Sequence, residues 1–324
     1  MFKKLLLVVS LQLLLQANSK DVITIAGPSA SVSHPIFKMI KNDAFKSIGK
    51  TIEFKHWKNP DQLKAMILNK KVDFIATPIT ASSILYNKGI NIKLTHLVMG
   101  GARGILTKDK NIKFIKDLKG KTLGIPARGG LGDSLIRILL EENGLNPKKD
   151  LKIVYTNSSK NSTMMLLKNK IDCAVFSEPR LSMTLKKAKS LPSDKLSHKL
   201  FYNIDILKSW KKTFNTNTTF AQVAFLAVGK TANDKELIKN FVSEYEKSLN
   251  WYINNPKKSS KLVSMNLKGL HPKAISNGIK NSSLYILKSS DDKQKIKKLL
   301  NNLVKYNPKS MGKKAPDDGF YFNK

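Results

Sequence analysis

Cysteine is nearly absent from this sequence of 324 residues, because Cys173 is the only one. One cysteine excludes a disulfide within the chain. Cys173 alternates with apolar neighbours in a predicted strand at residues 171–176, so we expect it in the core.

The sequence also lacks the usual patterns of catalytic and metal sites. Its five histidines show no H-x-x-x-H or comparable metal-ligand spacing, and no G-x-S-x-G motif occurs. Ser29, Ser31 and Ser134 have no recognisable partner base. We therefore expect no catalytic residue, no metal and no cofactor.

Negative charge is scarce, with 23 acidic residues against 58 basic ones and a formal net charge of +35. The lysines are spread along almost every predicted helix, which favours a solvated surface over a nucleic-acid-binding stripe. We expect no nucleic-acid partner. Weak attraction to anionic membrane surfaces remains an alternative explanation of the charge.

Arginine is rare, and its four positions are clustered: Arg103, Arg128, Arg137 and Arg180. Three of them follow predicted strand ends, where the planar guanidinium can grip a carboxylate, sulfonate or phosphate. Chance clustering is the alternative. Arg137 is expected to be structural, because Asp133 and Glu141 lie four residues away on either side.

Only one long apolar run is present, at residues 5–15, behind Lys3 and Lys4. Residues 17–19 follow with a small-x-small cleavage pattern, which is typical of a secretory signal peptide over residues 1–19. An uncleaved anchor or a buried N-terminal helix is the alternative. No cysteine near the cleavage site is available for lipidation, so we expect an exported, processed and unlipidated protein.

The remaining sequence alternates strand and helix patterns, which predicts an α/β fold with mainly parallel sheets flanked by helices. We expect two similar lobes, the first built from residues 20–106 and 226–324 and the second from residues 107–225. Crossover strands near residues 104–107 and 219–228 would form the hinge. Terminal helices are expected at residues 234–253, 272–279 and 292–306, and a polar, loose tail from Pro308 onward.

Four short motifs have the spacing of a known family: NKKVDF at residues 69–74, DLKGK at 117–121, Gly144-Leu145, and SEP at 177–179. With them, the chain resembles the periplasmic solute-binding proteins of ABC importers, in the nitrate, sulfonate, taurine and thiamine-precursor (NMT1/THI5-like) branch. The resemblance covers about residues 22–190. The chain departs from the family pattern at two places. A lysine replaces the glycine that precedes Val72 in the pattern, and His34-Pro35 is one residue shorter than the family's H-x-P.

The resemblance implies a two-lobed periplasmic binding protein fold of type II, which closes on a solute and then docks on an inner-membrane permease. In such sheets the ligand lies beyond the carboxyl ends of the strands. The glycine-rich loop after residues 122–125 is therefore the main predicted site. Its backbone N–H groups at a helix start favour an anion. Asp133 has an alternative role, because its carboxylate can cap that helix and would then require a donor on the ligand.

The predicted ligand-binding residues follow several strand ends: Ser29, Ser31, His34, Thr77, Thr80, Gly101, Arg103, Arg128, Gly129, Gly130, Asp133, Ser134, Glu178, Asn217 and Thr219. Each has a structural alternative. The serines and threonines can cap helices or form turns, Gly101 and Arg103 can form a hinge turn, and Glu178 can pair with Arg180. Asn217 and Thr219 can belong to an ordinary polar loop.

These patterns together predict a monomeric, periplasmic receptor for a small anionic or zwitterionic organic solute, and not an enzyme. Lobe closure would be its physical mechanism. One alternative is a protein that binds the pyrimidine precursor of thiamine, or a synthase of that precursor on the same fold. Another is a ligand sensor that acts on a membrane kinase.

Overall fold

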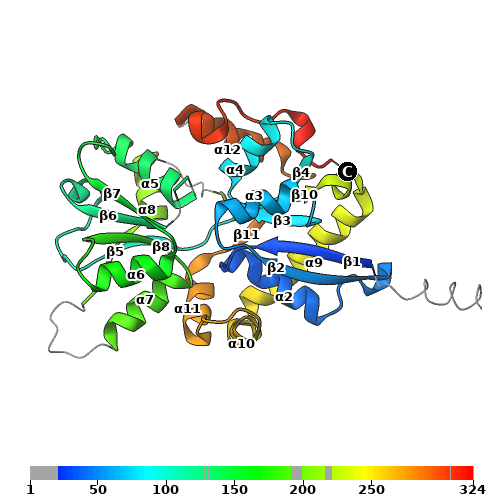
Figure 1. Cartoon of the computed structure of the whole chain (residues 1–324), viewed down its shortest axis with the longest axis horizontal. Coiled ribbons are helices and arrows are strands. Elements are labelled where there is room, and N and C mark those ends of the chain that lie inside the picture. The colour runs from blue at the N-terminus through cyan, green and yellow to red at the C-terminus, as the bar shows by residue number, and fades with distance from the viewer. Residues whose placement is uncertain are drawn as a thin grey trace, which may run out of the picture.

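The fold divides into two lobes, each built on its own β-sheet (Figure 1). It was obtained as a computed structural model that describes residues 21–126, 128–129, 131–190, 199–215, 221–306 and 308–323. The predicted signal peptide lies outside the described residues. Within them, no helix is both long and apolar enough to span a membrane.

The sheet of the first lobe has six strands. In spatial order they are β11 (Tyr285–Lys288), β4 (Ile92–Met99), β10 (Ala221–Val228), β3 (Phe74–Thr77), β1 (Asp21–Gly27) and β2 (Lys50–His56). The β3–β1–β2 part is parallel, whereas β10 runs antiparallel to both of its neighbours. The carboxyl ends of β1 and β3 therefore lie at the same edge of the sheet.

The sheet of the second lobe has five strands. In spatial order they are β7 (Lys152–Thr156), β6 (Thr122–Pro126), β8 (Cys173–Ser177), β5 (Arg103–Thr107) and β9 (Phe201–Asp205). Its β7–β6–β8 part is parallel, and β5 is antiparallel to β8 and β9. The order matches that of β2–β1–β3–β10–β4, so the two lobes share one topology. The expected α/β fold with two parallel-core sheets is confirmed.

Helices cover both faces of each sheet (Figure 1). Those of the first lobe are α2 (His34–Lys41), α3 (Pro60–Leu68), α4 (Ile79–Asn87), α9 (Lys235–Asn254), α10 (Pro256–Asn266), α11 (Pro272–Ser282) and α12 (Lys293–Tyr306). Those of the second lobe are α5 (Leu131–Glu142), α6 (Ser159–Leu167), α7 (Arg180–Lys189) and α8 (Ile206–Thr213). Short 3-10 turns join several of these elements.

Local signals in the sequence set several of the boundaries. Asn59 caps α3 by accepting a hydrogen bond from the Gln62 N–H at 2.9 Å, and Pro60 occupies the first helical position. Asp234 caps α9 in the same way, through the Leu237 N–H at 2.9 Å. α9 begins within one residue of its predicted start at 234, because caps are encoded locally.

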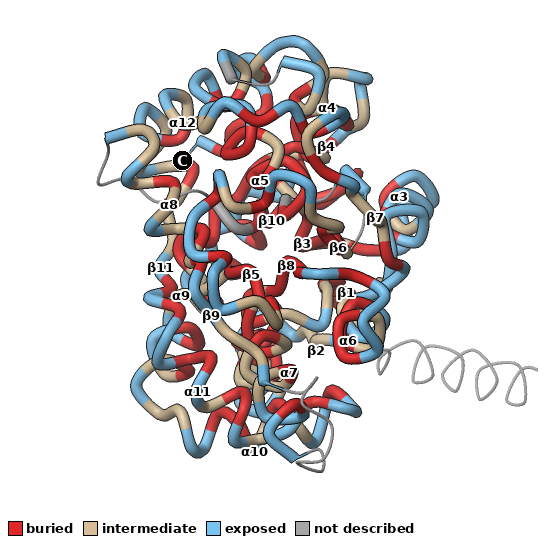
Figure 2. The backbone as a smooth tube through the Cα atoms, turned by 90° about the vertical axis from the view of Figure 1, so that its left-hand side faces the viewer, coloured by how far each residue is buried: buried red, intermediate tan, exposed pale blue. Residues whose placement is uncertain are grey.

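Buried apolar side chains form separate cores on the two faces of each sheet. Figure 2 marks the buried residues along the backbone of both lobes. In the first lobe, α9 packs on the sheet with Phe241 stacked on Phe74 at a ring distance of 4.0 Å. In the second lobe, Cys173 is fully buried on β8, which confirms its predicted place in the core. Burial raises the pKa of the Cys173 thiol well above its ordinary value, so the sulfur stays protonated.

The chain passes between the lobes just before β5 and again between α8 and β10. The strand that follows each passage enters the middle of its new sheet, so Arg103–Thr107 belongs to the second sheet and Ala221–Val228 to the first. The sheets thus divide the chain a few residues earlier than the lobe boundaries proposed at 106/107 and 225/226. Those boundaries stay predictions.

The expectation of a loose C-terminal tail is wrong. Phe320, Tyr321 and Phe322 are buried, and the Phe322 N–H donates to the Leu94 carbonyl of β4 at 3.0 Å. The short strands β9 and β11 were also not predicted. All of these segments are held by contacts with distant residues, and they are too short to show a period of their own.

Candidate functional site

The first loop at the carboxyl edge of the first lobe is tightly packed against the end of β1. A Cβ atom on Gly27 would lie 2.2 Å from Oγ of Ser33, so this close approach requires glycine. Ser33 is fully buried, and its hydroxyl has no hydrogen-bond partner among the described residues. Ser29 differs, because it is exposed and its Oγ lies 2.9 Å from Nε2 of His56.

His34 begins α2 and is buried with 1% of its surface exposed. Its Nδ1 lies 2.8 Å from the hydroxyl of Tyr252 on α9, which also hydrogen-bonds Ser31. Burial lowers the pKa of His34 to about 3, so the imidazole is neutral at physiological pH. Within the described residues, Nε2 has no partner. Sequence reasoning missed Ser33 and Tyr252, because neither carries a local motif.

The next strand of this edge presents two further hydroxyls of the same kind. Thr77 ends β3 and Thr80 lies in the first turn of α4, with 0% and 3% of their surfaces exposed. Neither Oγ1 atom has a hydrogen-bond partner in the described part of the chain. The indole of Trp57 donates to the Ala76 carbonyl at 3.0 Å and fixes the strand end beside them.

Four buried polar atoms without a partner thus lie in the segments that follow two neighbouring strands: Ser33 Oγ, His34 Nε2, Thr77 Oγ1 and Thr80 Oγ1. Most buried polar atoms in proteins have a partner, and each one left without costs about 1–3 kcal/mol. Such a cluster is typical of a surface that forms its hydrogen bonds with a bound molecule. We call these four atoms the open polar edge.

The passage into the second lobe is built from glycines. Gly100 and Gly101 have φ angles of 80° and 87°, and a Cβ atom on Gly100 would lie 2.3 Å from the Ser283 carbonyl oxygen. The Gly101 N–H donates to the Ser282 carbonyl at 2.5 Å. Gly101 therefore has a structural role here, as its hinge alternative predicted.

Arg103 follows this passage at the start of β5, where it pairs with Ser177 of β8. Its Nη1 lies 3.0 Å from the position a Cβ atom of Gly132 would occupy, so the guanidinium packs on the first turn of α5. Burial lowers the pKa of Arg103 to about 10, and the group remains cationic at neutral pH. The absence of a side chain at Gly132 makes room for this charge.

The glycine-rich loop before α5 is closed by Asp133. Its carboxylate accepts hydrogen bonds from the Gly129 N–H at 2.8 Å, from Nε of Arg137 at 2.8 Å and from the Tyr155 hydroxyl at 3.0 Å. Asp133 is 4% exposed. The Asp133 carboxylate therefore occupies the start of α5 itself, which was the alternative role considered for it. It also pairs with Arg137, as expected. Its carboxylate would repel an anion at that point.

Two other predicted residues that the structure describes lie around this loop. Arg128 is exposed and stacks over the ring of Tyr155 at 4.6 Å, and Ser134 is buried in the first turn of α5. Gly130 lies outside the described residues, as do Asn217 and Thr219. Their roles stay predictions.

Glu178 lies at the junction of the two lobes. Its carboxylate accepts hydrogen bonds from Oγ and N–H of Ser182 at 2.8 and 3.1 Å, and a Cβ atom on Gly278 of α11 would lie 3.1 Å from its own Cβ. Burial raises the pKa of Glu178 above its ordinary value, although the Ser182 hydrogen bonds oppose the shift. These bonds go to Ser182 on α7, whereas the alternative prediction paired Glu178 with Arg180.

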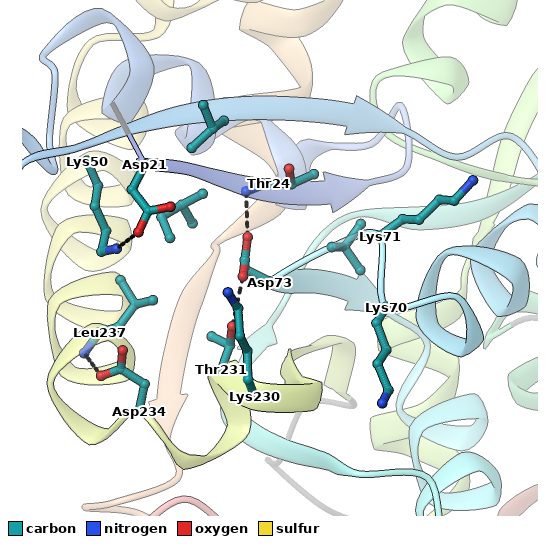
Figure 3. Close-up of a pocket in the computed structure, with 13 residues that line it drawn as sticks. Asp21, Thr24, Lys50, Lys70, Lys71, Asp73, Lys230, Thr231, Asp234 and Leu237 are labelled. Carbon is teal, nitrogen blue, oxygen red and sulfur yellow. Dashed lines mark hydrogen bonds and ion pairs between the residues drawn. The ribbon is translucent and has the colours of Figure 1, made fainter. Parts of the chain in front are cut away.

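Two surface cavities lie elsewhere on the first lobe. One, of about 420 Å³, opens at the amino-terminal ends of β1 and β3, the opposite edge from the open polar edge (Figure 3). Its carboxylates are engaged internally: Asp21 pairs with Lys50 at 2.5 Å, and Asp73 accepts from the Thr24 N–H at 2.9 Å. The other, of about 510 Å³, lies between β4 and the C-terminal segment. Neither is lined by a predicted site residue.

The described residues contain no group of three or more His, Cys, Asp and Glu side chains placed to hold a metal ion. The strand ends of the first lobe carry buried neutral groups, whereas those of the second lobe carry the guanidinium groups of Arg103 and Arg128 and the carboxylates of Asp133 and Glu178.

The chain matches the family described as NMT1/THI5 like over residues 35–259, more than half of its length, and it belongs to this family. No curated protein matches the chain.

Several solved structures share the fold. A protein described as an ABC transporter, from Parabacteroides distasonis, is 24% identical, with 94% of this chain and 99% of that chain covered and a TM-score of 0.73. The periplasmic aliphatic sulphonate binding protein SsuA from Escherichia coli is 14% identical, with coverages of 92% and 96% and a TM-score of 0.71. The alkanesulfonate-binding protein SsuA from Xanthomonas axonopodis pv. citri, solved with MOPS, is 13% identical, with coverages of 93% and 96% and a TM-score of 0.69.

Proposed function

We propose that this protein is the extracytoplasmic solute-binding receptor of an ABC importer, and that it captures a small anionic or zwitterionic organic solute of the sulfonate or taurine kind. The open polar edge is the observation that carries the proposal. Family membership supports it, as do solved relatives of the same fold that are described as sulfonate-binding proteins.

The chemistry of the two lobes suits such a ligand. The hydroxyls of Ser33, Thr77 and Thr80 can donate to an oxyanion, and the neutral imidazole of His34 carries one N–H and one lone pair. Arg103 supplies a buried positive charge from the second lobe. A solute that binds the polar groups of the first lobe and Arg103 of the second would stabilise the arrangement in which the two lobes are closed on it. Only that arrangement offers all of these contacts at once.

The proposed partners follow from this role. The closed receptor would dock as a monomer on an inner-membrane permease, and the protein would be exported by its signal peptide. It would perform no catalysis, since the ligand is bound and released unchanged.

A second candidate ligand is a neutral pyrimidine, such as a thiamine precursor. The family description supports this candidate, and so does the neutral state of His34, which can offer a donor or an acceptor to a ring nitrogen. The two candidates differ in their need for positive charge, because only the anion requires Arg103.

The test is a thermal-shift and calorimetric screen of taurine, alkanesulfonates, nitrate, bicarbonate and pyrimidines on the wild-type protein and on Arg103→Met. A ligand of the native state raises the unfolding midpoint. We expect a sulfonate to raise it in the wild type and to lose at least about tenfold in affinity in the variant. A hit by a pyrimidine alone, equal in both proteins, selects the second candidate. No shift with any organic solute refutes both.

A further inference from the structure

The last third of the chain contains a long stretch without negative charge. No aspartate or glutamate occurs in residues 247–290, whereas eight lysines do. The same stretch contains no arginine. This asymmetry is not explained by the proposed solute site, which lies on other elements.

The fold places the middle of this stretch on the helical hairpin of α10 and α11, which pack against each other. Lys257, Lys258 and Lys261 on α10 and Lys273 on α11 are all exposed. Met265 is 80% exposed, and it lies one helical turn beyond Lys261 and two beyond Lys257, on the same face of α10.

A helix of the second lobe extends this basic surface. α7 packs on α11, and Nζ of Lys186 lies 3.3 Å from Nε2 of His271. Lys187 and Lys189, near the end of α7, are also exposed. Two views at right angles place α7, α10 and α11 together at the lower end of the molecule (Figures 1 and 2).

Within the part of the chain that the structure describes, acidic side chains do not neutralise these lysines. The ion pairs formed by the acid-free stretch lie at its two ends, where Lys247 pairs with Glu244 at 2.7 Å and Lys288 with Glu246 at 2.6 Å. Among the described residues, Lys257, Lys258 and Lys261 form no ion pair.

We propose that this face binds an anionic phospholipid surface, with the lysines of α10, α11 and α7 against the headgroups and Met265 entering between them. Lysine is a compact point charge on a flexible stem, which suits a fluid array of headgroups. Fixed phosphate or carboxylate groups on a protein partner are gripped better by arginine, which is absent from α10 and α11. An exposed apolar side chain among lysines is typical of interfacial binding. The inference is independent of the solute.

The experiment measures co-flotation of the protein with lipid vesicles. The exported and processed protein is mixed with phosphatidylcholine vesicles, with or without about one third phosphatidylglycerol, at about 0.05 M and about 0.5 M salt. We expect binding only to the anionic vesicles, and only at low salt. Each lysine near such a surface raises partition about fivefold.

Two matched pairs of charge reversals distinguish vesicle binding by this face from binding by the overall positive charge of the protein. Lys258→Glu with Lys261→Glu should lower partition at least about tenfold, whereas Lys148→Glu with Lys149→Glu, exposed beside Asp150 in the second lobe, should change it less than about twofold. Met265→Ser should cost about threefold without changing the salt dependence. Circular dichroism of each variant checks that it is folded.

Three outcomes would overturn the proposal. Absence of binding to anionic vesicles at low salt would refute it, and an acidic protein surface would then be the better partner. Equal losses from the two charge reversals would assign the binding to overall charge. Equal binding to neutral vesicles in all variants would assign it to another part of the chain.

Discussion

The two lobes share one strand order, yet their corresponding strand ends differ in chemistry. After β1 and β3 of the first lobe, four buried polar atoms have no partner within the described residues. After β6 and β8 of the second lobe, the buried carboxylates are satisfied by the protein: Asp133 by its own lobe, and Glu178 by Ser182 of α7 and Asn281 of α11. Topology thus places the loops at one edge, but it does not decide which lobe keeps hydrogen bonds available for a ligand.

This difference separates stability from binding. Groups satisfied inside the protein should matter mainly for folding, whereas groups left open should matter mainly for affinity. Mutations on the two lobes can therefore test whether stability and binding are divided in this way.

The largest expected effect is on the stability of the second lobe. Asp133→Ala removes the acceptor of Gly129, Arg137 and Tyr155 and leaves a half-buried guanidinium unpaired, which should lower the free energy of unfolding by about 3 kcal/mol. Urea unfolding measures it. Asp109→Ala, which breaks the exposed pair with Lys121, is the control and should cost less than about 1 kcal/mol. Equal costs would contradict the internal role of Asp133.

The second effect is acid sensitivity of the first lobe. Burial lowers the pKa of His34 to about 3, so the unfolded chain binds a proton at this residue between pH 6.5 and 3 while the folded chain does not. The contribution of His34 to stability should therefore fall as the pH falls below 6.5, by about 1.4 kcal/mol per pH unit, and His96, whose pKa burial also lowers to about 3, adds a second contribution that the variant keeps. Unfolding curves for the wild type and His34→Gln at pH 7 and pH 5 test it, and the variant should show the shallower dependence. Parallel curves would refute the assignment.

The third effect concerns the open hydroxyls. Thr77→Val and Thr80→Val should each lower ligand affinity about tenfold, and the unliganded protein should be as stable as the wild type or more so. Thr163→Val is the matched control, because its Oγ1 lies 2.8 Å from Oγ1 of Thr184. That change should cost about 1 kcal/mol in stability and leave affinity intact. A loss of stability at Thr77 or Thr80 would show that the hydroxyl is engaged in the free protein.

The smallest effect is at Glu178. Because burial raises its pKa, the folded state holds the proton more tightly, and the stability contributed by this group falls as pH rises above about 4.5. Glu178→Gln should therefore gain less than about 1 kcal/mol relative to the wild type at pH 7 and nothing near pH 4. Chemical denaturation at both pH values measures this difference. A larger gain in stability at pH 4 than at pH 7 would mean that folding lowers the pKa of Glu178, which would contradict the prediction.

The sequence predicted elements best where the signals are local. The strand before the glycine-rich loop and the capped start of α9 lie within a residue or two of their expected positions. The partners of Tyr252 and Phe322 are more than 200 residues away, so no window of sequence reveals them. The position of the candidate site could be predicted from where the strands end. Which polar groups there are hydrogen-bonded inside the protein, and which are left without a partner, depends on side-chain contacts that the sequence does not reveal.

The placement of β10 between β3 and β4 affects the order in which the two lobes can fold during synthesis. Nearly all of the second lobe is one uninterrupted segment, and it is synthesised before β10 exists. The first lobe is completed only when β10, α9 and finally Phe322 are available, which requires closure of a loop longer than the second lobe itself. The second lobe is therefore expected to fold early, and chains shortened at their C-terminus should retain it while the first lobe remains incomplete.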